Sequence, residues 1–178
     1  MSDGEMERCI ARVAGGDMEA LHALYDAMRG AVFALALAVT RDRQLAEDVL
    51  QDVFVQAYAG ARSFRGGRPR AWLMRIARNR AISVLRKRKR EAPTMEPLSD
   101  AAQATSELLE APELERALAC LDGRDREIVL LSAVAELTNR EIAGVLGMPQ
   151  GSVSWRYRLA MDRLRRTLEG IVEHAAKS

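Results

Sequence analysis

Residues 138–158 read TNREIAGVLGMPQGSVSWRYR, and they give the clearest indication of the fold. Thr138 and Glu141 stand three residues apart, as in a capping box, where each side chain accepts a hydrogen bond from the other residue's amide and a helix begins. Gly147 suits the left-handed conformation that ends a helix, and Pro149 presets φ for the next one. Two helices joined by so tight a turn predict a helix-turn-helix, and an ordinary helical hairpin is the less favoured alternative.

The second of these helices has one apolar and one polar face. Residues at three- and four-residue spacing would be buried: Val153, Tyr157, Ala160, Leu164, Leu168 and Ile171. The other face would be presented to DNA: Ser152, Ser154, Trp155, Arg156, Arg158, Leu159 and Arg163. Side chains near the N-terminal end of such a helix reach base edges in a major groove, and outlying arginines contact phosphates.

Positive charge is concentrated in two parts of the chain, although the net charge is only +2. Residues 62–90 carry twelve basic residues and no acidic one, whereas residues 91–112 carry five acidic residues, three prolines and no basic one. A second basic cluster lies in the helix-turn-helix region: Arg156, Arg158, Arg163, Arg165 and Arg166. A basic run is often only a solvated face. Twelve cations without counter-charges would repel one another, however, so nucleic acid is the favoured partner.

The rest of the chain is helical in pattern. Only 4% of residues are aromatic, and no stretch alternates apolar and polar residues as strands do. Asp17 and Asp42 can cap helices that run to about residues 40 and 59, and Pro69 suits the first turn of a third. Further helices are expected near residues 113–121 and 124–136.

We therefore predict an all-α fold of two small helical domains joined by a flexible acidic linker. Residues 1–90 form the first domain and residues 113–178 the second, which contains the helix-turn-helix. Residues 91–112 form the linker, because they are rich in proline, serine and threonine and show little periodicity. The two basic clusters then lie in different domains, so the chain would contact a duplex at two separate places.

The third helix is the second candidate for DNA contact. One stripe of it carries Trp72, Arg75, Asn79, Ser83 and Arg86. Asparagine suits bidentate hydrogen bonding to adenine, and arginine suits phosphate or guanine. In the preceding glycine-containing loop, Phe64 offers a ring beside which an unstacked base could lodge. A core or boundary position for Trp72 is at least as well supported as base contact.

An acidic and polar ridge marks the second helix: Glu47, Asp48, Gln51 and Asp52. Such a ridge is usually plain solvated surface. On a chain that otherwise binds DNA, it could instead be a docking face for a protein partner.

Several functions find no support in the sequence. No P-loop and no nucleophile–histidine–carboxylate arrangement is present, so we expect no enzyme activity and no cofactor. Cys9 and Cys120 are isolated, so we expect neither a metal site nor a disulfide. The first residues are acidic where a signal peptide is basic, and the apolar run at residues 31–39 is short for a bilayer span. We therefore expect a cytoplasmic protein without direct membrane contact.

These motifs together resemble the extracytoplasmic-function (ECF) group of bacterial sigma factors, the promoter-recognition subunits of RNA polymerase. The resemblance covers about residues 20–90 (sigma region 2) and 114–168 (sigma region 4). Its marks occur in the expected order: AEDVLQDVF at 46–54, Phe64-Arg65-Gly66, AWLMRIARNRAISVLR at 71–86, and the stretch at 138–158 quoted above.

The resemblance implies a sigma factor that binds core RNA polymerase and directs promoter recognition and DNA melting. It assigns the ridge, Glu47, Asp48, Gln51 and Asp52, to the β′ clamp helices of the polymerase, and it adds the β flap as a polymerase contact. It assigns contacts with the −10 element to Phe64, Arg65, Trp72, Arg75, Arg78, Asn79, Arg80, Ser83 and Arg86. It assigns contacts with the −35 element to Ser152, Ser154, Trp155, Arg156, Arg158, Leu159 and Arg163. It also implies an anti-sigma factor as a partner and a linker that follows the RNA-exit path.

Two departures from the family pattern stand out. The loop continues as Gly67-Arg68-Pro69-Arg70, which puts the shape of the flipped-base pocket in question. In the recognition helix Ser154 and Trp155 take the early positions, and Leu159 and Met161 replace common arginines. This favours either an unusual −35 preference or a partly protein-facing surface.

Two other functions stay open at this point. A sigma mimic would bind an anti-sigma factor without initiating transcription. A conventional operator-binding regulator with two DNA modules would bind its site without polymerase.

Overall fold

The computed structural model describes residues 1–91 and 118–175, with side chains as far as residue 170. All regular structure in these residues is helical, and they contain no strand, which confirms the all-α prediction. The elements are α1 (Asp3–Ala14), α2 (Met18–Thr40), α3 (Arg43–Gly60), the short 3-10 helix η1 (Ala61–Ser63), α4 (Pro69–Glu91), α7 (Gly123–Ala133), α8 (Asn139–Leu146) and α9 (Gln150–Ala175). The predicted linker and most of the helix expected near 113–121 lie outside the described residues.

Helix ends follow the capping signals in the sequence. The Asp17 carboxylate accepts hydrogen bonds from the amides of Glu19 and Ala20, and Asp42 accepts one from Leu45 at 3.0 Å. These bonds satisfy amides that have no partner within the first turn of a helix. Helix α1 was not expected, although a Ser2 and Glu5 capping box begins it and could have been found in the sequence.

The helix-turn-helix has the predicted local geometry. Thr138 and Glu141 form a complete capping box, with 2.8 Å between the Thr138 amide and the Glu141 carboxylate. Gly147 ends α8 with φ of +65°, a left-handed conformation that costs glycine little. Helix α9 begins at Gln150 and buries Val153, Ala160 and Leu164 as expected, whereas Tyr157 and Leu168 are only half-buried.

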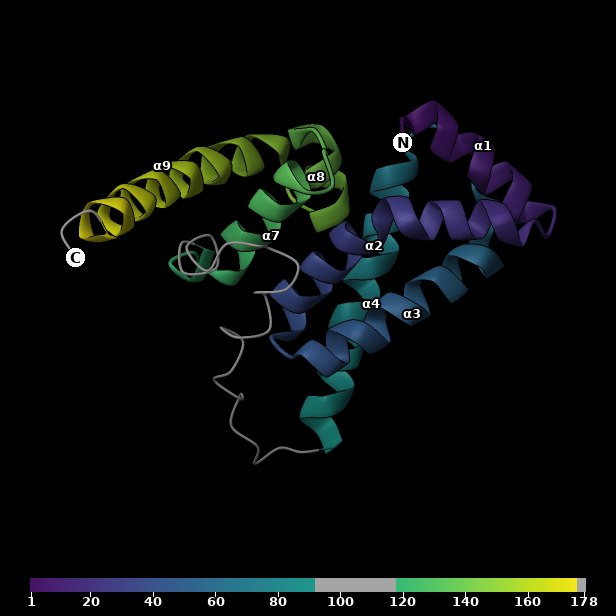
Figure 1. The fold of residues 1–178 in the computed structure, drawn as a ribbon, viewed down its shortest axis with the longest axis horizontal. Helices are drawn as coiled ribbons and strands as arrows, with labels where there is room; N and C mark the ends of the chain where they lie inside the picture. Colours follow the sequence, from purple (N-terminus) through teal and green to yellow (C-terminus); the bar gives the residue numbers. More distant parts are fainter. Residues whose placement is uncertain (92–117, 176–178) are drawn as a thin grey trace.

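Helix α2 is the centre of the molecule. Helices α1, α3 and α4 pack around it, and α7 packs on it from the C-terminal part of the chain (Figure 1). By length and composition α2 is apolar enough to cross a membrane, yet 61% of that stretch is buried inside the protein. Its apolar stretch is thus longer than residues 31–39 suggest, and it is largely used as core.

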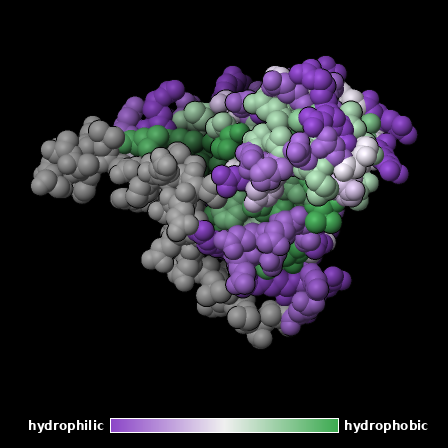
Figure 2. All heavy atoms as spheres, turned by 45° about the vertical axis from the view of Figure 1, so that its right-hand side comes forward, coloured by the Kyte–Doolittle hydropathy of each residue, from purple (hydrophilic) through white to green (hydrophobic). Residues whose placement is uncertain are grey.

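The two sequence-predicted domains pack against each other in this structure. Ile128 and Leu131 of α7 are fully buried in the same hydrophobic cluster as Leu24 and Leu35 of α2. Helix α8 packs on α4. A second, smaller cluster joins α7 and α9 to Ala38 near the end of α2. Hydrophilic residues cover much of the face shown in Figure 2, with hydrophobic residues in patches between them.

Candidate nucleic-acid interface

The predicted −10 residues of α4 fall into two groups. Arg75, Asn79, Ser83 and Arg86 are exposed, and their spacing of four, four and three residues puts them along one face of the helix. Helix α4 runs unbroken from Pro69 to Glu91, so this face is continuous along the helix. Arg78 and Arg80 point elsewhere and are held by carboxylates.

The ion pair of Arg78 is more buried than that of Arg80. Its Nε lies 2.6 Å from Oε2 of Glu127 in α7, and the two side chains are only 13% and 12% exposed. Arg80 lies 2.5 Å from Asp52 on α3, with both side chains about a third exposed. One predicted DNA contact therefore binds the C-terminal part of the chain, and another binds the predicted polymerase ridge. Neither partner is evident from the sequence, because each lies far away along the chain.

Further carboxylates of the C-terminal part form ion pairs with arginines at or just before the start of α4. Arg68 lies 3.0 Å from Glu141, and Arg70 lies 3.1 Å from Glu136. Burial alone would raise the pKa of Glu141, but hydrogen bonds from Thr138 and the charge of Arg68 outweigh it and lower the pKa. Together with Glu127, these groups neutralise three arginines that a phosphate backbone would otherwise attract.

The two aromatic residues among the predicted −10 contacts, Phe64 before α4 and Trp72 within it, lie against each other. The rings of Phe64 and Trp72 are 5.2 Å apart and tilted by 53°. Both are half-buried and pack against the main core. For Trp72 this is the boundary position that the sequence left open. Arg65, in the loop beside them, is exposed.

The ridge on α3 is open to solvent at three of its four positions. Glu47, Asp48 and Gln51 are exposed, and Asp52 is half-buried by its pair with Arg80. Glu47 is paired with Arg43 one turn earlier at 2.9 Å. The exposed carboxylate of Asp48 is therefore the simplest part of the ridge to test.

The predicted −35 residues divide between structural contacts and free surface. Ser154 accepts a hydrogen bond from the Asn139 side chain at 3.1 Å, which ties α9 to α8. Arg156 lies 3.2 Å from Asp122 and 3.1 Å from Asp125, and Arg163 lies 3.5 Å from Asp125. Ser152 is half-buried. Trp155, Arg158 and Leu159 are the members exposed without a contact of this kind among the described residues.

Asp125 is a buried acid that the sequence analysis missed. Its side chain is 6% exposed, and burial raises the pKa of its carboxyl, an effect that the charges of Arg156 and Arg163 offset only in part. The Arg156 guanidinium lies at ion-pair distance but does not meet hydrogen-bond geometry with it. Asp122 and Asp125 stand three residues apart at the start of α7. This spacing is the feature of the sequence that could have pointed to Asp125.

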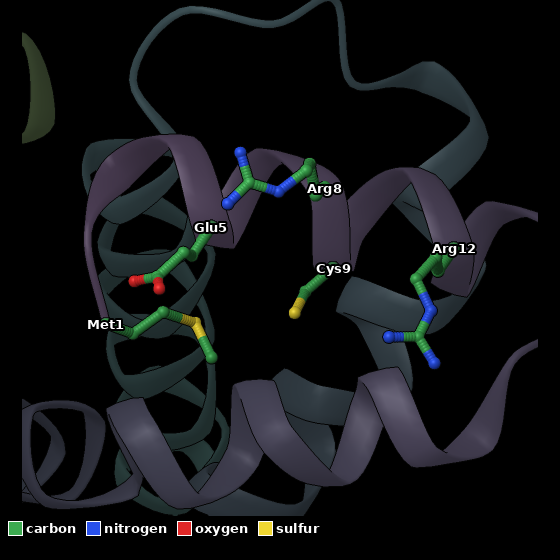
Figure 3. A pocket seen from close by; sticks show the side chains of 5 residues that line it. All are labelled: Met1, Glu5, Arg8, Cys9 and Arg12. Carbon is green, nitrogen blue, oxygen red and sulfur yellow. The ribbon is translucent and has the colours of Figure 1, made fainter.

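A separate hollow of about 520 Å³ lies beside α1 (Figure 3). Its lining residues come from α1 and from Met1, which lies two positions before the helix: Met1, Glu5, Arg8, Cys9 and Arg12. It includes none of the predicted site residues. Among the described residues, no group of three or more His, Cys, Asp or Glu side chains is placed to hold a metal ion.

An all-α chain with a helix-turn-helix and a second basic helix has the architecture of a helical transcription protein. Comparison with known proteins identifies the family. The family description Sigma-70 region 2 matches residues 24–91, and Sigma-70, region 4 matches residues 112–164. The ECF RNA polymerase sigma factor SigM of Mycobacterium tuberculosis is 32% identical over 94% of this chain and 85% of its own length. RpoE of Cereibacter sphaeroides is 36% identical over 67% of this chain and 70% of its own.

Solved structures agree with this assignment. CnrH in complex with the cytosolic domain of CnrY matches with a TM-score of 0.67 and 27% identity over 93% of this chain and 98% of that one. The sigma factor RpoE in complex with the anti-sigma factor NepR from Bartonella quintana matches with a TM-score of 0.64 and 27% identity over 80% and 92%. The chain belongs to the ECF RNA polymerase sigma factors, and it directs transcription initiation.

The start of α7 generates a pH-dependent prediction. The Asp125 amide donates to the Asp122 carboxylate at 2.7 Å and lowers the pKa of Asp122, with help from Arg156. A pKa lowered by folding means that the stabilisation is fully present above the unfolded pKa of about 3.9 and is lost as the pH falls through the folded value. We expect Asp122→Ala to cost about 1 kcal/mol at pH 7 and less near pH 3.

Urea unfolding from pH 7 to pH 3 measures this difference. Asp122→Asn is the matched control, since asparagine also caps a helix but cannot ionise. A stability gap between wild type and Asp122→Ala that stays constant over this range would contradict the assignment.

Proposed function

We propose that α4 and the loop at residues 64–68 bind the −10 element, that α9 binds the −35 element, and that the α3 ridge docks on the β′ clamp helices. The β flap is a further polymerase contact in this proposal. The observation that carries it is the exposed stripe of Arg75, Asn79, Ser83 and Arg86 on α4. Arg75 and Arg86 are about 16 Å apart along the helix at about 1.5 Å per residue, which spans several base steps.

The chemistry of this stripe suits promoter DNA. The two arginines can neutralise phosphates, and the Asn79 amide can hydrogen-bond to an adenine edge or an unpaired base. Phe64, half-buried beside Trp72, offers an aromatic edge next to the exposed loop, where a flipped base could stack. DNA melting would then be driven by binding energy, without nucleotide hydrolysis by this chain.

In this structure α7 packs on α2 and α8 packs on α4, which we call the closed arrangement. Binding of DNA to α4 requires this arrangement to open. Glu127 forms an ion pair with Arg78. Helix α8 lies so close to α4 that a Cβ added to Gly144 would be 3.8 Å from the guanidinium of Arg75. A duplex cannot reach Arg78 while Glu127 and α7 cover it, and α8 narrows the approach to the exposed Arg75. We therefore infer that the C-terminal part leaves α4 when the sigma factor joins polymerase and promoter.

An anti-sigma factor is the regulator that we propose. One similar structure is the sigma factor RpoE bound to the anti-sigma factor NepR, and another is CnrH bound to the cytosolic domain of CnrY. We place the protein in the cytoplasm, where it meets core polymerase. Run-off transcription with core polymerase tests the function as a whole: a sigma mimic gives no transcript, and an operator-binding regulator binds its site equally well without polymerase.

Asn79→Ala tests the −10 assignment. Loss of the amide should slow open-complex formation by about tenfold, in line with the 1–3 kcal/mol that a base contact contributes, while affinity for core polymerase stays unchanged. Permanganate footprinting measures the opening, and fluorescence anisotropy measures core binding. Glu19→Ala, an exposed change on α2, is the control. An equal loss of core binding would show that α4 is misassigned.

Asp48→Lys tests the docking ridge. This position is preferable to Asp52, whose replacement would also break the pair with Arg80. We expect at least a tenfold loss of affinity for core polymerase, because the charge reversal changes an attraction into a repulsion. Asp26→Lys makes the same charge change on α2 and should have little effect. Unaltered affinity of the Asp48→Lys protein would remove the ridge from the interface.

Glu127→Gln tests the closed arrangement. The substitution keeps the side-chain shape and removes the charge that holds Arg78. We expect the free chain, without polymerase, to bind a short fluorescent oligonucleotide several-fold more tightly than wild type, since the closed state is weakened. Glu47→Gln removes a carboxylate from an exposed pair on α3 and is the control. A binding curve identical to wild type would mean that Glu127 does not restrain α4.

A further inference from the structure

We propose that Trp155 and Leu159 read the C5-methyl groups of thymines in the upstream promoter element. The inference rests on the proposed function, in which the start of α9 lies in a major groove. It names two specificity-determining residues and the chemical group that they recognise.

The two residues form an exposed apolar pair. Trp155 is 56% exposed and Leu159 is 37% exposed, and a spacing of four residues places them on one face, about 6 Å apart along the helix. Two polar neighbours are engaged within the protein, because Asn139 binds Ser154, and Asp122 and Asp125 bind Arg156. Trp155 and Leu159 are therefore the large exposed groups on this face, with the exposed Arg158 beside them.

The surroundings of the pair favour DNA over an apolar protein helix. Arg158 is exposed beside Leu159, and Arg163 follows one turn later with its side chain 55% exposed. An apolar pair inside a basic surface suits a ligand with a charged backbone and a small apolar group. Asp162, on the same face and 3.8 Å from Arg165, would repel phosphates, so the base contacts should end at Leu159.

Base-pair chemistry then identifies the group. In the major groove the base edges present hydrogen-bond donors and acceptors, and the apolar group among them is the thymine C5-methyl. Leucine has no hydrogen-bonding group, and tryptophan has a single N–H donor. Since base pairs rise about 3.4 Å per step, a pair of side chains about 6 Å apart covers two neighbouring steps. We expect one or two thymines within two or three consecutive positions of the element.

The experiment uses the wild-type holoenzyme, so no variant needs to fold. Preferred promoters are first selected from a library with a randomised upstream element. Each thymine of that element is then replaced by uracil, which lacks only the methyl group, and holoenzyme affinity is measured by competition. We expect about a fourfold loss for each contacted methyl and no loss at other thymines.

Protein variants link the effect to the two residues. Trp155→Ala and Leu159→Ala should each abolish the uracil effect at the thymine that the lost side chain contacts, and a holoenzyme with both changes should bind thymine and uracil promoters equally. Met161→Ala is the matched control, because Met161 is 36% exposed but lies on another face of α9, and it should keep the full uracil effect.

Two results would overturn the proposal. Wild-type holoenzyme that selects no thymine, or that tolerates uracil at every position, does not read methyl groups there. Loss of core polymerase binding by Trp155→Ala, with the uracil effect retained, would place the pair against protein. A holoenzyme that selects no upstream sequence at all would instead contradict the assignment of α9, which keeps the two failures distinguishable.

Discussion

The second half of α2 needs cover on all sides, and the other helices supply it. Every residue from 31 to 40 is buried or half-buried, so this stretch has no face that can be left to water. Helices α3 and α4 cover part of it, and α7 covers another part through Leu130 and its neighbours. The C-terminal part is therefore held to the N-terminal part by apolar contact. Its departure would expose that surface, at about 25 cal/mol per Å², unless a partner covers it.

Electrostatics adds specificity to this apolar contact. Glutamates of the C-terminal part pair with Arg68, just before α4, and with Arg70 and Arg78 in its first half, whereas Arg75, Asn79, Ser83 and Arg86 stay exposed. In the proposed DNA-bound arrangement, Arg78 would exchange the Glu127 carboxylate for a phosphate. Because a carboxylate neutralises one charge and a duplex offers many, polymerase and promoter together can displace the internal pairs.

Helix α9 also carries side chains of two kinds, those paired within the protein and those exposed to solvent. Arg156 holds the helix against Asp122 and Asp125, and Ser154 holds it against Asn139, so these side chains maintain the shape of the helix-turn-helix. Trp155, Arg158 and Leu159 are left to face outward. The exposed surface near the start of α9 thus carries two large apolar side chains beside Arg158.

The local structure of this protein could be predicted from the amino-acid order alone. Caps at Asp17, Asp42 and Thr138, the left-handed Gly147 and the apolar spacing of α9 depend on residues a few positions apart, so they could be predicted, as could the family. Helix α1 was within reach of the same reasoning, through its Ser2 and Glu5 capping box. Only the tertiary structure decided which charges meet. Arg78 with Glu127, Arg80 with Asp52, and Arg156 with Asp125 join residues 49, 28 and 31 positions apart. Spacing along one helix cannot show such partners, because they are chosen by how whole helices pack.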